Sequence, residues 1–559
     1  MSDFSAADKR ASLDGAAAMK PVTSAPAKAV VTSHDLDATD ERLQQLGYAP
    51  EMRRNLSVGA VIGLGAAIIA APFGLSTSAS FALINGGATS YFWGWFLLSL
   101  ISVAIAASLG EVCSLYPSSG GVYVWTAYLA PRKASVLASF VVGWISVIAN
   151  ITLCLSIAFG EAQLIMAGIS VFRNNEWTPE TWHTILCFWA VMVFAAAVNA
   201  FGVKGNYLEL LNVSSMWWTG ATSIIILVTT LAMSDDKRSA QEVFAQWENS
   251  SGWPDGWSFF VGLLTPAYVL TGYGTISALC EEVVEPERAV PRAMVGSVLA
   301  ASLTGFLYVL PLAFVLPVDL DSILTSAAGQ PVVVLFSQVT GSAGGAFGLL
   351  FLILGIGLFA SVGSLTVAIR CTWAFSRDGG LPGSRWLRIV NKRLDVPLNS
   401  LFVSTGLIMA LGLIYFGATA AFSAFTGACT ILLGVSYVFP VVMVILQGRR
   451  PMRDAPWSLG VWGWAANIIA LAWVLFSIVL FCFPTTAENT PETINYASVV
   501  VVFFACGAAV YYFAGARKFY TGPLGVLKED ERMHAIEERH AAGAAAPEHP
   551  VSRLESGKD

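Results

Sequence analysis

The sequence predicts an all-α integral membrane protein with twelve transmembrane helices. Of its 559 residues, 55% are hydrophobic and only 12% are charged, whereas a soluble domain carries about a quarter charged residues. Twelve stretches are apolar and long enough, at about 20 residues, to cross a bilayer as helices. Basic residues gather in the loops on one side of these stretches, so two independent patterns lead to the same fold class.

The twelve spans are separated by connections that are mostly short. They are expected at about residues 57–85, 90–115, 135–169, 182–201, 207–233, 257–281, 290–316, 342–373, 398–417, 421–447, 460–483 and 494–516. The first, third and eighth are the longest of the set.

Lysine and arginine in the short loops set the expected orientation. One set of loops carries fourteen basic residues, and the opposite set carries only Arg173, Lys237 and Arg238. No lysine or arginine is expected inside a span. Because the number of spans is even, both tails lie on the same side, which the charge rule assigns to the cytoplasm.

Residues 1–50 and 521–559 are expected to be cytoplasmic tails that flank a membrane domain of residues 51–520. The N-terminal segment is rich in Ala, Ser, Asp and Lys and lacks the apolar core of a signal peptide. Its composition is typical of disorder. The outer loop before the sixth span holds Asn249-Ser-Ser, a sequon close enough to the membrane that it could also remain unmodified.

Metal, redox and nucleic-acid functions find no support in the composition. The eight cysteines lie in or at the ends of apolar segments without a CxxC pair, which favours small buried side chains over metal ligands or disulfides. The histidines form no cluster, and no basic face suggests nucleic acid. No His, Asp or Ser constellation indicates an enzyme, so we expect neither a metal nor another cofactor.

Clusters of helix-breaking residues occur near the middle of the first and sixth spans. The first contains Pro72 and Gly74 followed by serine and threonine, and the sixth contains Pro266 and then Thr271-Gly-Tyr-Gly. Irregular backbone persists in a membrane only where it faces protein or a polar cavity. Interrupted helices in corresponding positions of two halves mark the binding site of many transporters, although small residues also serve helix packing.

This pairing predicts two inverted repeats of five helices each, at about 57–233 and 257–447, with two extra helices at about 460–516. A broken helix offers free N–H groups to a carboxylate and free carbonyls to an ammonium group. The candidate solute-binding residues are Phe73, Gly74, Leu75, Ser76, Tyr268, Thr271, Gly272, Tyr273 and Gly274. Either tyrosine of the sixth span could form an aromatic wall beside an ammonium group.

Four segments resemble the amino acid–polyamine–organocation superfamily. They are SLGEVCSLYPSSGGVYVW (108–125), AFSRDGGLPGSRWLRIVNKRLDVPLNS (374–400), EEVVEPERAVPRAM (281–294) and LQQLGYAPEMRRNLSVG (43–59). The resemblance covers about residues 43–520 and is strongest for the fungal amino acid, choline and GABA permease branch. It implies the five-plus-five (LeuT-like) fold, a solute held between spans one and six, and alternating access driven by protons or by exchange.

Two features depart from relatives in this superfamily. Many have an aspartate after the tyrosine of span six, where this chain has Gly274. Some have a lysine within span five that stands in for a sodium ion, whereas Lys204 lies at the mouth of that span. The resemblance therefore specifies neither the solute nor the coupling ion.

Acidic residues supply the candidates for coupling or gating. Glu161 is the carboxylate expected well inside a span, where an ionisable group is expensive and a function is the default interpretation. It could carry a proton or attract a cationic solute, or it could lie in a wetted outer vestibule. Glu111, Glu281 and Glu282 lie at cytoplasmic ends, where pairing with arginines such as Arg370 or Arg377 could latch an inner gate.

These observations favour a secondary transporter that moves a small amine-containing solute, such as an amino acid, GABA or choline, across a fungal-type plasma membrane. Choline lacks a carboxylate, so it would use the aromatic wall and not the free N–H groups. The alternative is a transport-inactive nutrient sensor of the same fold. The expected partners are the solute and the lipid bilayer, and the sequence does not indicate an oligomeric state.

Overall fold

The computed structural model describes Leu43, Tyr48 and residues 56–523, apart from 174–176, 203–206, 327–328, 418–420, 489 and 491–493. The expected tails, residues 1–50 and 521–559, therefore lie almost entirely outside the described residues. Within those residues the chain is helical apart from one short pair of strands.

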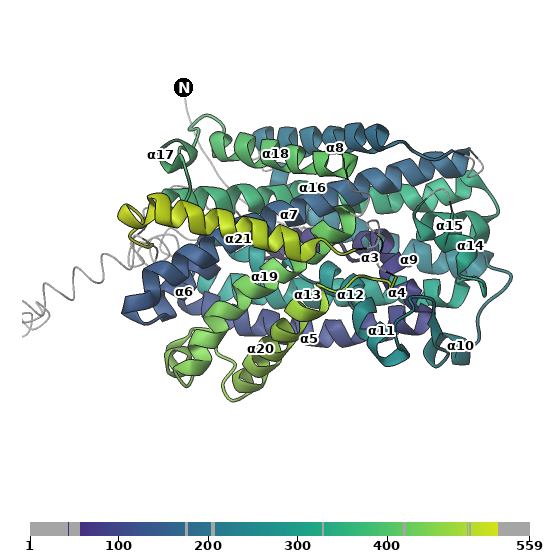
Figure 1. Ribbon diagram of the computed structural model, residues 1–559, viewed down its shortest axis with the longest axis horizontal. Coiled ribbons are helices and arrows are strands. Elements are labelled where there is room, and N and C mark those ends of the chain that lie inside the picture. Colours follow the sequence, from purple (N-terminus) through teal and green to yellow (C-terminus); the bar gives the residue numbers. More distant parts are fainter. Residues whose placement is uncertain are drawn as a thin grey trace, which may run out of the picture.

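Twelve helical segments of the described chain are long and apolar enough to span a membrane, as the sequence predicted. In chain order they are α2 and α3 (Val58–Ile69, Ala71–Thr77), α5 (Gly87–Leu115), α7 (Arg132–Phe172), α8 (Thr181–Phe201), α9 (Tyr207–Met233), α11, α12 and η1 (Asp255–Gly262, Leu264–Val269, Gly272–Glu282), α13 (Pro286–Val315), α16 (Ala343–Arg377), α18 with η2 (Leu398–Gly412, Leu413–Phe416), α19 (Ala421–Leu446), α20 (Trp462–Leu480) and α21 (Ala497–Ala514). The spans lie side by side along the long axis of Figure 1.

The connecting segments cap the two ends of this bundle. They are α4 (Ala79–Ile84), β1 (Asn85–Gly86), α6 (Val122–Leu129), α10 (Ala240–Phe244), β2 (Glu248–Asn249), α14 (Asp321–Leu324), α15 (Pro331–Thr340), α17 (Ser384–Leu387), η3 (Arg450–Asp454) and η4 (Ala516–Lys518). In Figure 1, α6 and α17 lie at one end, and α10, α11 and α14 lie at the other. β1 and β2 pair antiparallel, so the loop before span six is fastened to the start of span two.

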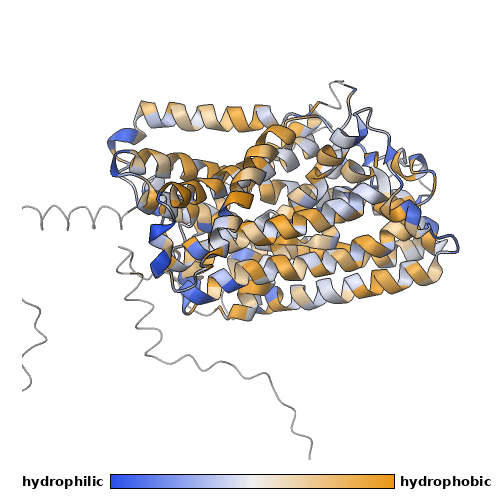
Figure 2. Ribbon diagram, turned by 90° about the horizontal axis from the view of Figure 1, so that it is seen from below, coloured by the Kyte–Doolittle hydropathy of each residue, from blue (hydrophilic) through white to orange (hydrophobic). Residues whose placement is uncertain are grey.

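Polar residues gather at both ends of the spans, and the length between them is apolar (Figure 2). We call the end that carries Arg370, Arg377 and Arg449 the arginine-rich end. The expectation that no lysine or arginine lies inside a span is wrong for Arg370. This residue lies within α16, about two turns before the last residue of the helix. A charge is tolerated there because Glu282 pairs with it.

The first four spans pack against their counterparts five positions later. α3 contacts α12, α5 contacts α13, α7 contacts α16, and α8 contacts α18. This pairing is the packing that two inverted repeats of five helices produce, and the fold is the five-plus-five arrangement with two additional C-terminal helices.

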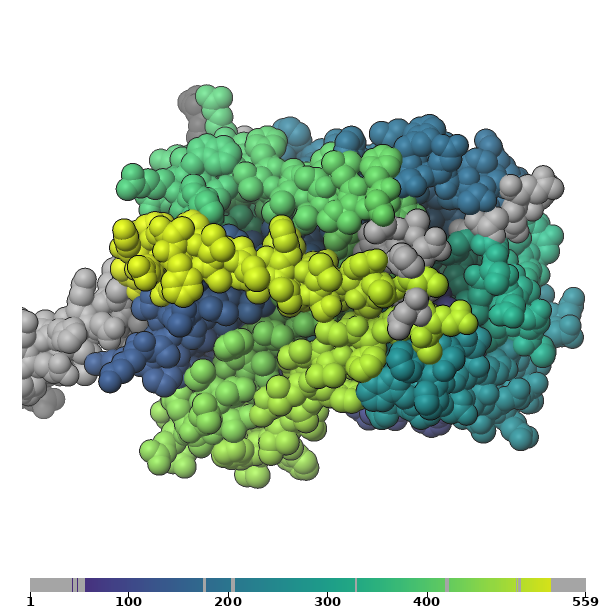
Figure 3. Space-filling view, in the orientation of Figure 1, coloured from purple at the N-terminus to yellow at the C-terminus, as the bar shows by residue number. Residues whose placement is uncertain are grey.

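Burial within the bundle is uneven. Buried residues make up 83% of the apolar window in spans one and three and 89% in span six, but only 6% in α21. Figure 3 shows α21, in yellow, running along the outer face of the molecule. The first, third and sixth spans therefore form the centre of the protein, where a site sheltered from lipid can exist.

Candidate functional site

Span one is interrupted at Ala70. This residue has φ 45° and ψ 51°, a left-handed conformation, between the end of α2 at Ile69 and the start of α3 at Ala71. The sequence expected the interruption around Pro72 and Gly74, and Ala70 lies two residues before Pro72. Pro72 begins the new helix and does not end the old one, because proline is favoured in the first turn, where its missing N–H costs nothing.

Span six is interrupted where the sequence predicted, but the chain there stays helical. α12 ends at Val269, and the segment from Gly272 to Glu282 continues as a 3₁₀ helix of 11 residues. Such long 3₁₀ runs are uncommon and often mark a hinge. Threonine hydroxyls cover part of the freed backbone, since Thr271 Oγ1 donates to the Ala267 carbonyl and Thr275 Oγ1 to the Gly272 carbonyl.

A small pocket lies between the two breaks and the middle of α7. We call it the first pocket; it is lined by Ile68, Ile69, Ala70, Phe73, Gly74, Leu153, Ile157, Tyr268, Val269 and Gly272. Its volume is about 10 Å³, which is close to the space one water molecule needs. The breaks are therefore closed around the pocket in this conformation.

Four of the predicted solute-binding residues meet at the first pocket, namely Phe73, Gly74, Tyr268 and Gly272. The other five do not line it. Ser76 Oγ is engaged by the Pro72 carbonyl and the Tyr308 hydroxyl, and the Leu75 carbonyl accepts from Tyr91. Of the remaining three, Thr271 directly precedes Gly272, whereas Tyr273 and Gly274 follow it in the 3₁₀ segment.

The family resemblance implies a wall from span three, which is α7, but the sequence did not single out the residues that form it. Leu153 and Ile157 lie one turn apart on that helix, and nothing in the sequence distinguishes them from the other apolar residues around them. Ala70 was also missed, because left-handed backbone is usually signalled by glycine.

The break leaves polar groups at the first pocket. α2 ends at Ile69, and Pro72 has no N–H to offer the Ile68 carbonyl four residues earlier. The Tyr268 hydroxyl is buried at this pocket without a hydrogen bond within the described residues. Such groups are expensive in a protein interior, which marks this pocket as a polar binding position.

Glu161 lies directly behind this pocket. A Cβ placed on Gly357 of α16 would fall 1.8 Å from Glu161 Oε2 and 2.6 Å from the edge of the Phe73 ring. The carboxyl group and the ring therefore approach the same point on α16. Glu161 is fully buried, and within the described chain neither of its oxygens has a hydrogen-bond partner. The interpretation as a wetted vestibule residue is thus wrong.

Glu281 and Glu282 form ion pairs with the two arginines that the sequence suggested. Arg377 donates to both oxygens of Glu281 at 2.8 Å, and Arg370 Nε donates to Glu282 at 2.5 Å. All four side chains are buried. The two pairs join the end of span six to the end of span eight.

Aromatic residues surround Arg377 at this end. Its guanidinium lies 4.2 Å from the Tyr48 ring centre and 4.6 Å from that of Trp373. The Tyr48 and Tyr123 hydroxyls both donate to Asp378 Oδ2. Burial, and next the Asp378 carboxylate, raise the pKa of each hydroxyl well above its usual value, so both remain protonated donors.

Glu111 has a different partner from the one suggested. Arg449 Nη2 donates to both of its oxygens, at 2.8 and 2.7 Å. Oε1 also accepts from the Leu459 N–H and the Ser458 hydroxyl. This cluster joins span two to the segment between α19 and α20, away from span six.

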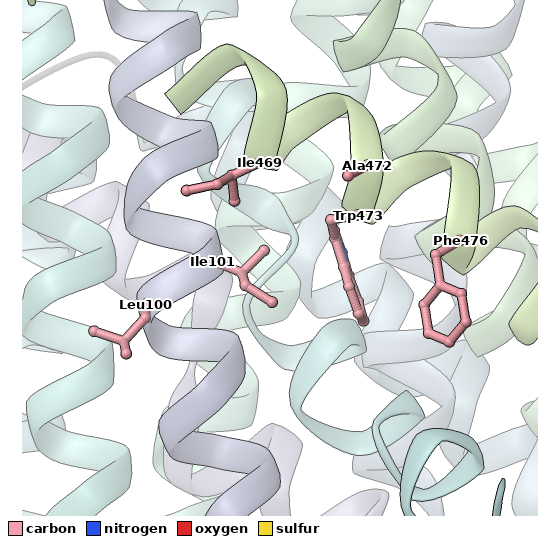
Figure 4. Close-up of a pocket in the computed structure, with 6 residues that line it drawn as sticks. All are labelled: Leu100, Ile101, Ile469, Ala472, Trp473 and Phe476. Carbon is pink, nitrogen blue, oxygen red and sulfur yellow. The ribbon is translucent and has the colours of Figure 1, made fainter. Parts of the chain in front are cut away.

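A larger cavity, of about 460 Å³, lies between α5 and α20 (Figure 4). Its lining is Leu100, Ile101, Ile469, Ala472, Trp473 and Phe476. Leu100 and Ile469 are among the exposed apolar residues, so this groove opens towards the surface that lipid covers. It has no polar group suited to an amine, and it is not the solute site.

A twelve-span helical bundle with two interrupted central helices defines the class of membrane permeases. The chain belongs to the amino acid permease family, whose model matches residues 55–505. The family consists of membrane permeases and not of enzymes.

Several fungal relatives carry informative names. The choline transporter of Saccharomyces cerevisiae is 32% identical over 87% of this chain and 84% of its own. The polyamine transporter TPO5 of the same yeast is 32% identical over 88% and 81%. Amino-acid permease 2 of Neurospora crassa is 29% identical over 90% and 92%. The crystal structure of MhsT in complex with L-phenylalanine matches the fold with a TM-score of 0.53 at 14% identity, covering 77% of this chain and 98% of the other.

Proposed function

We propose that the protein is a secondary active transporter for a small solute that carries an amino or ammonium group. The observation that carries this proposal is the end of the half-helix α2 at the first pocket, where Ala70 is left-handed and Pro72 offers no N–H to the Ile68 carbonyl. Carbonyls at the end of a half-helix lie at the negative pole of its dipole and attract a cation.

The aromatic residues of the pocket extend the range of solutes. Phe73 and Tyr268 offer ring faces to an ammonium group that cannot donate hydrogen bonds, such as that of choline. The Phe73 N–H suits the carboxylate of an amino acid or of GABA. An ammonium group is the feature that cholines, polyamines and amino acids share, and those are the solutes in the relatives' names.

Alternating access would use the ion pairs at the arginine-rich end as a gate. Glu281 and Glu282 belong to the 3₁₀ part of span six, and their arginines belong to α16. With the pairs closed, as here, the end of span six is fastened to α16. Their separation would open the pocket towards that side.

Glu161 is the proposed proton-coupling residue. Its carboxyl group has no partner of its own within the described residues and shares a packing point with Phe73. A change in its charge would therefore be felt at the half-helix that holds the solute. Glu111 is better suited to holding the scaffold together, because its partners lie away from both breaks.

The charge rule supports an orientation in which the arginine-rich end and both tails face the cytoplasm of a plasma-membrane protein. Epitope tags at the two termini, tested for accessibility in intact cells, check the orientation, and microscopy of the tagged protein checks the membrane. Tags that are accessible in intact cells would show that the termini face outwards, which would contradict the proposed orientation.

The central test is uptake of radiolabelled amino acids, GABA, choline and polyamines in a permease-deficient host, repeated with purified protein in proteoliposomes. We expect uptake of at least one of these solutes. Binding without uptake would favour the transport-inactive sensor, and failure of every solute to bind would overturn the proposal.

A further inference from the structure

A second, more polar pocket lies beside the first. We call it the inner pocket; its lining is Ser119, Gly120, Val122, Ser146, Asn150, Gly274, Thr275, Ser277, Ala278, Val367, Cys371, Leu433, Ser436 and Tyr437. It borders the ion pairs at the arginine-rich end, since the Ser119 N–H donates to the Glu281 carboxylate at 3.4 Å. The inner pocket therefore lies between the first pocket and the arginine-rich end.

Two polar atoms belonging to residues of the inner pocket lack partners. Ser146 Oγ and Asn150 Oδ1 are buried and have no hydrogen bond within the described chain. Buried polar atoms of native proteins are nearly always satisfied by protein, water or a ligand. The inner pocket holds about 20 Å³, enough for a water molecule, and its hydroxyls are suited to solvating a polar solute once it widens.

Tyr437 of α19 lines the inner pocket and contacts the chain next to Gly272 of the first pocket. Its hydroxyl donates to the Thr271 carbonyl at 3.3 Å, directly at the end of the broken helix. Its ring lies 5.6 Å from that of Tyr273, at an angle of 36°. Gly272 lines the first pocket and Gly274 lines the inner one. Tyr437 therefore contacts the short stretch of chain, Thr271 to Gly274, that runs from one pocket to the other.

Gly274 is needed because of this ring. A Cβ at position 274 would lie 2.5 Å from Tyr437 Cε1 and 2.6 Å from Cζ, closer than real Cβ contacts come. The φ of Gly274 is not among the positive values, so space and not backbone conformation requires glycine. The tyrosine occupies the volume that any side chain at 274 would need.

We propose that Tyr437 is a gate between the first pocket and the inner pocket, and that the inner pocket is a second binding position for the solute on its way to the arginine-rich end. The gate is closed in this structure. Rotation of the ring away from Gly274 would release the Thr271 carbonyl and join the two pockets. This inference rests on the proposed transport function for its solute, but the gate itself can be tested without one.

The native Cys371 is a reporter, because it lines the inner pocket. The test uses the full-length chain with the other seven of its eight cysteines replaced, in sealed membrane vesicles. A small, membrane-impermeant thiol reagent is applied from the face opposite the arginine-rich end. Tyr437→Ala should raise the rate of Cys371 modification by about tenfold or more, which corresponds to about 1.4 kcal/mol. Tyr437→Phe, which keeps the ring but loses the hydrogen bond, should raise it less.

Tyr520→Phe is the matched control, since this buried tyrosine bonds to Ser139 away from both pockets and should leave the rate unchanged. An unchanged rate in Tyr437→Ala would overturn the gate. If labelling responds while no nitrogenous solute is transported, the gate stands and the proposed solute class fails.

The Gly274–Tyr437 contact has an independent test in thermal unfolding of the purified chain with its native cysteines. Gly274→Ala should lower Tm in the wild-type background and lower it less in a Tyr437→Ala background, because the clash is then gone. Equal shifts in both backgrounds would overturn the size match on which the gate depends.

Discussion

Glu161 is a buried carboxyl group whose surroundings indicate a function. Its carboxyl group is fully buried and lies beside Phe73, and within the described residues it has no hydrogen-bond donor. A carboxylate buried in this way is costly, and a chain would not keep it for stability, because a neutral side chain would pack at least as well. The residue therefore suits a reaction in which a proton arrives and leaves.

Glu161→Gln tests this role. The amide has nearly the same shape and no partner is lost, so we expect normal folding and surface expression. Proton-driven uptake should fall by roughly tenfold or more, about 1.4 kcal/mol, and should lose its dependence on external pH. Glu180→Gln, at the exposed start of α8, is the control and should behave as wild type. An unchanged pH profile in Glu161→Gln would make Glu161 structural.

Glu111 has the opposite character, because it is fully paired. Removing one partner of a buried ion pair leaves the other charged and costs about 3–5 kcal/mol. Glu111→Ala should therefore lower the thermal stability of the purified protein strongly, while solute affinity of the folded fraction changes little. A large loss of affinity without a loss of stability would instead assign Glu111 to the gate.

At the scale of elements, the spans and the break of span six could be predicted from the sequence, because apolar length and paired glycines are local signals. The residue at which the first span breaks could not. Ala70 adopts a conformation that alanine rarely adopts, and its surroundings rather than its identity hold it there. The residues of α7 that line the first pocket could not be predicted either, since they depend on which face of a uniformly apolar helix meets the breaks.

Gly272 links the two broken elements. A Cβ at this position would lie 2.6 Å from Ile68 Cγ2, so Gly272→Ala should push the Ile68 side chain into the first pocket. Overpacking of this kind costs about 1–3 kcal/mol, and we expect the apparent KM for the solute to rise by roughly tenfold. Gly220→Ala, on α9 with no heavy atom near its added Cβ, is the matched control. Equal kinetics for the two variants would show that Gly272 does not shape the pocket.

At the scale of the whole molecule, the buried charges at the two ends differ in what they join. Glu281 and Glu282 fasten the 3₁₀ end of span six to span eight at the arginine-rich end. At the opposite end of the bundle, Arg238 fastens the loop after span five to Glu248 and to the carbonyl group at the end of α13. The first set crosses between a broken helix and its neighbour, so its loss should change the conformational equilibrium as well as the stability.

Arg377→Gln should shift the protein towards a state open at the arginine-rich end. The variant leaves Glu281 buried without its partner, a penalty of about 3–5 kcal/mol that opening would relieve by hydrating the carboxylate. Cys280, buried next to Glu281, reports this opening when Cys113, whose Sγ lies 3.7 Å away, is replaced by alanine. Its modification by a thiol reagent should become at least about tenfold faster. Arg238→Gln should leave that rate unchanged, because its pair lies at the opposite end. If Arg377→Gln lowers stability without exposing Cys280, the ion pairs hold the fold together and do not gate it.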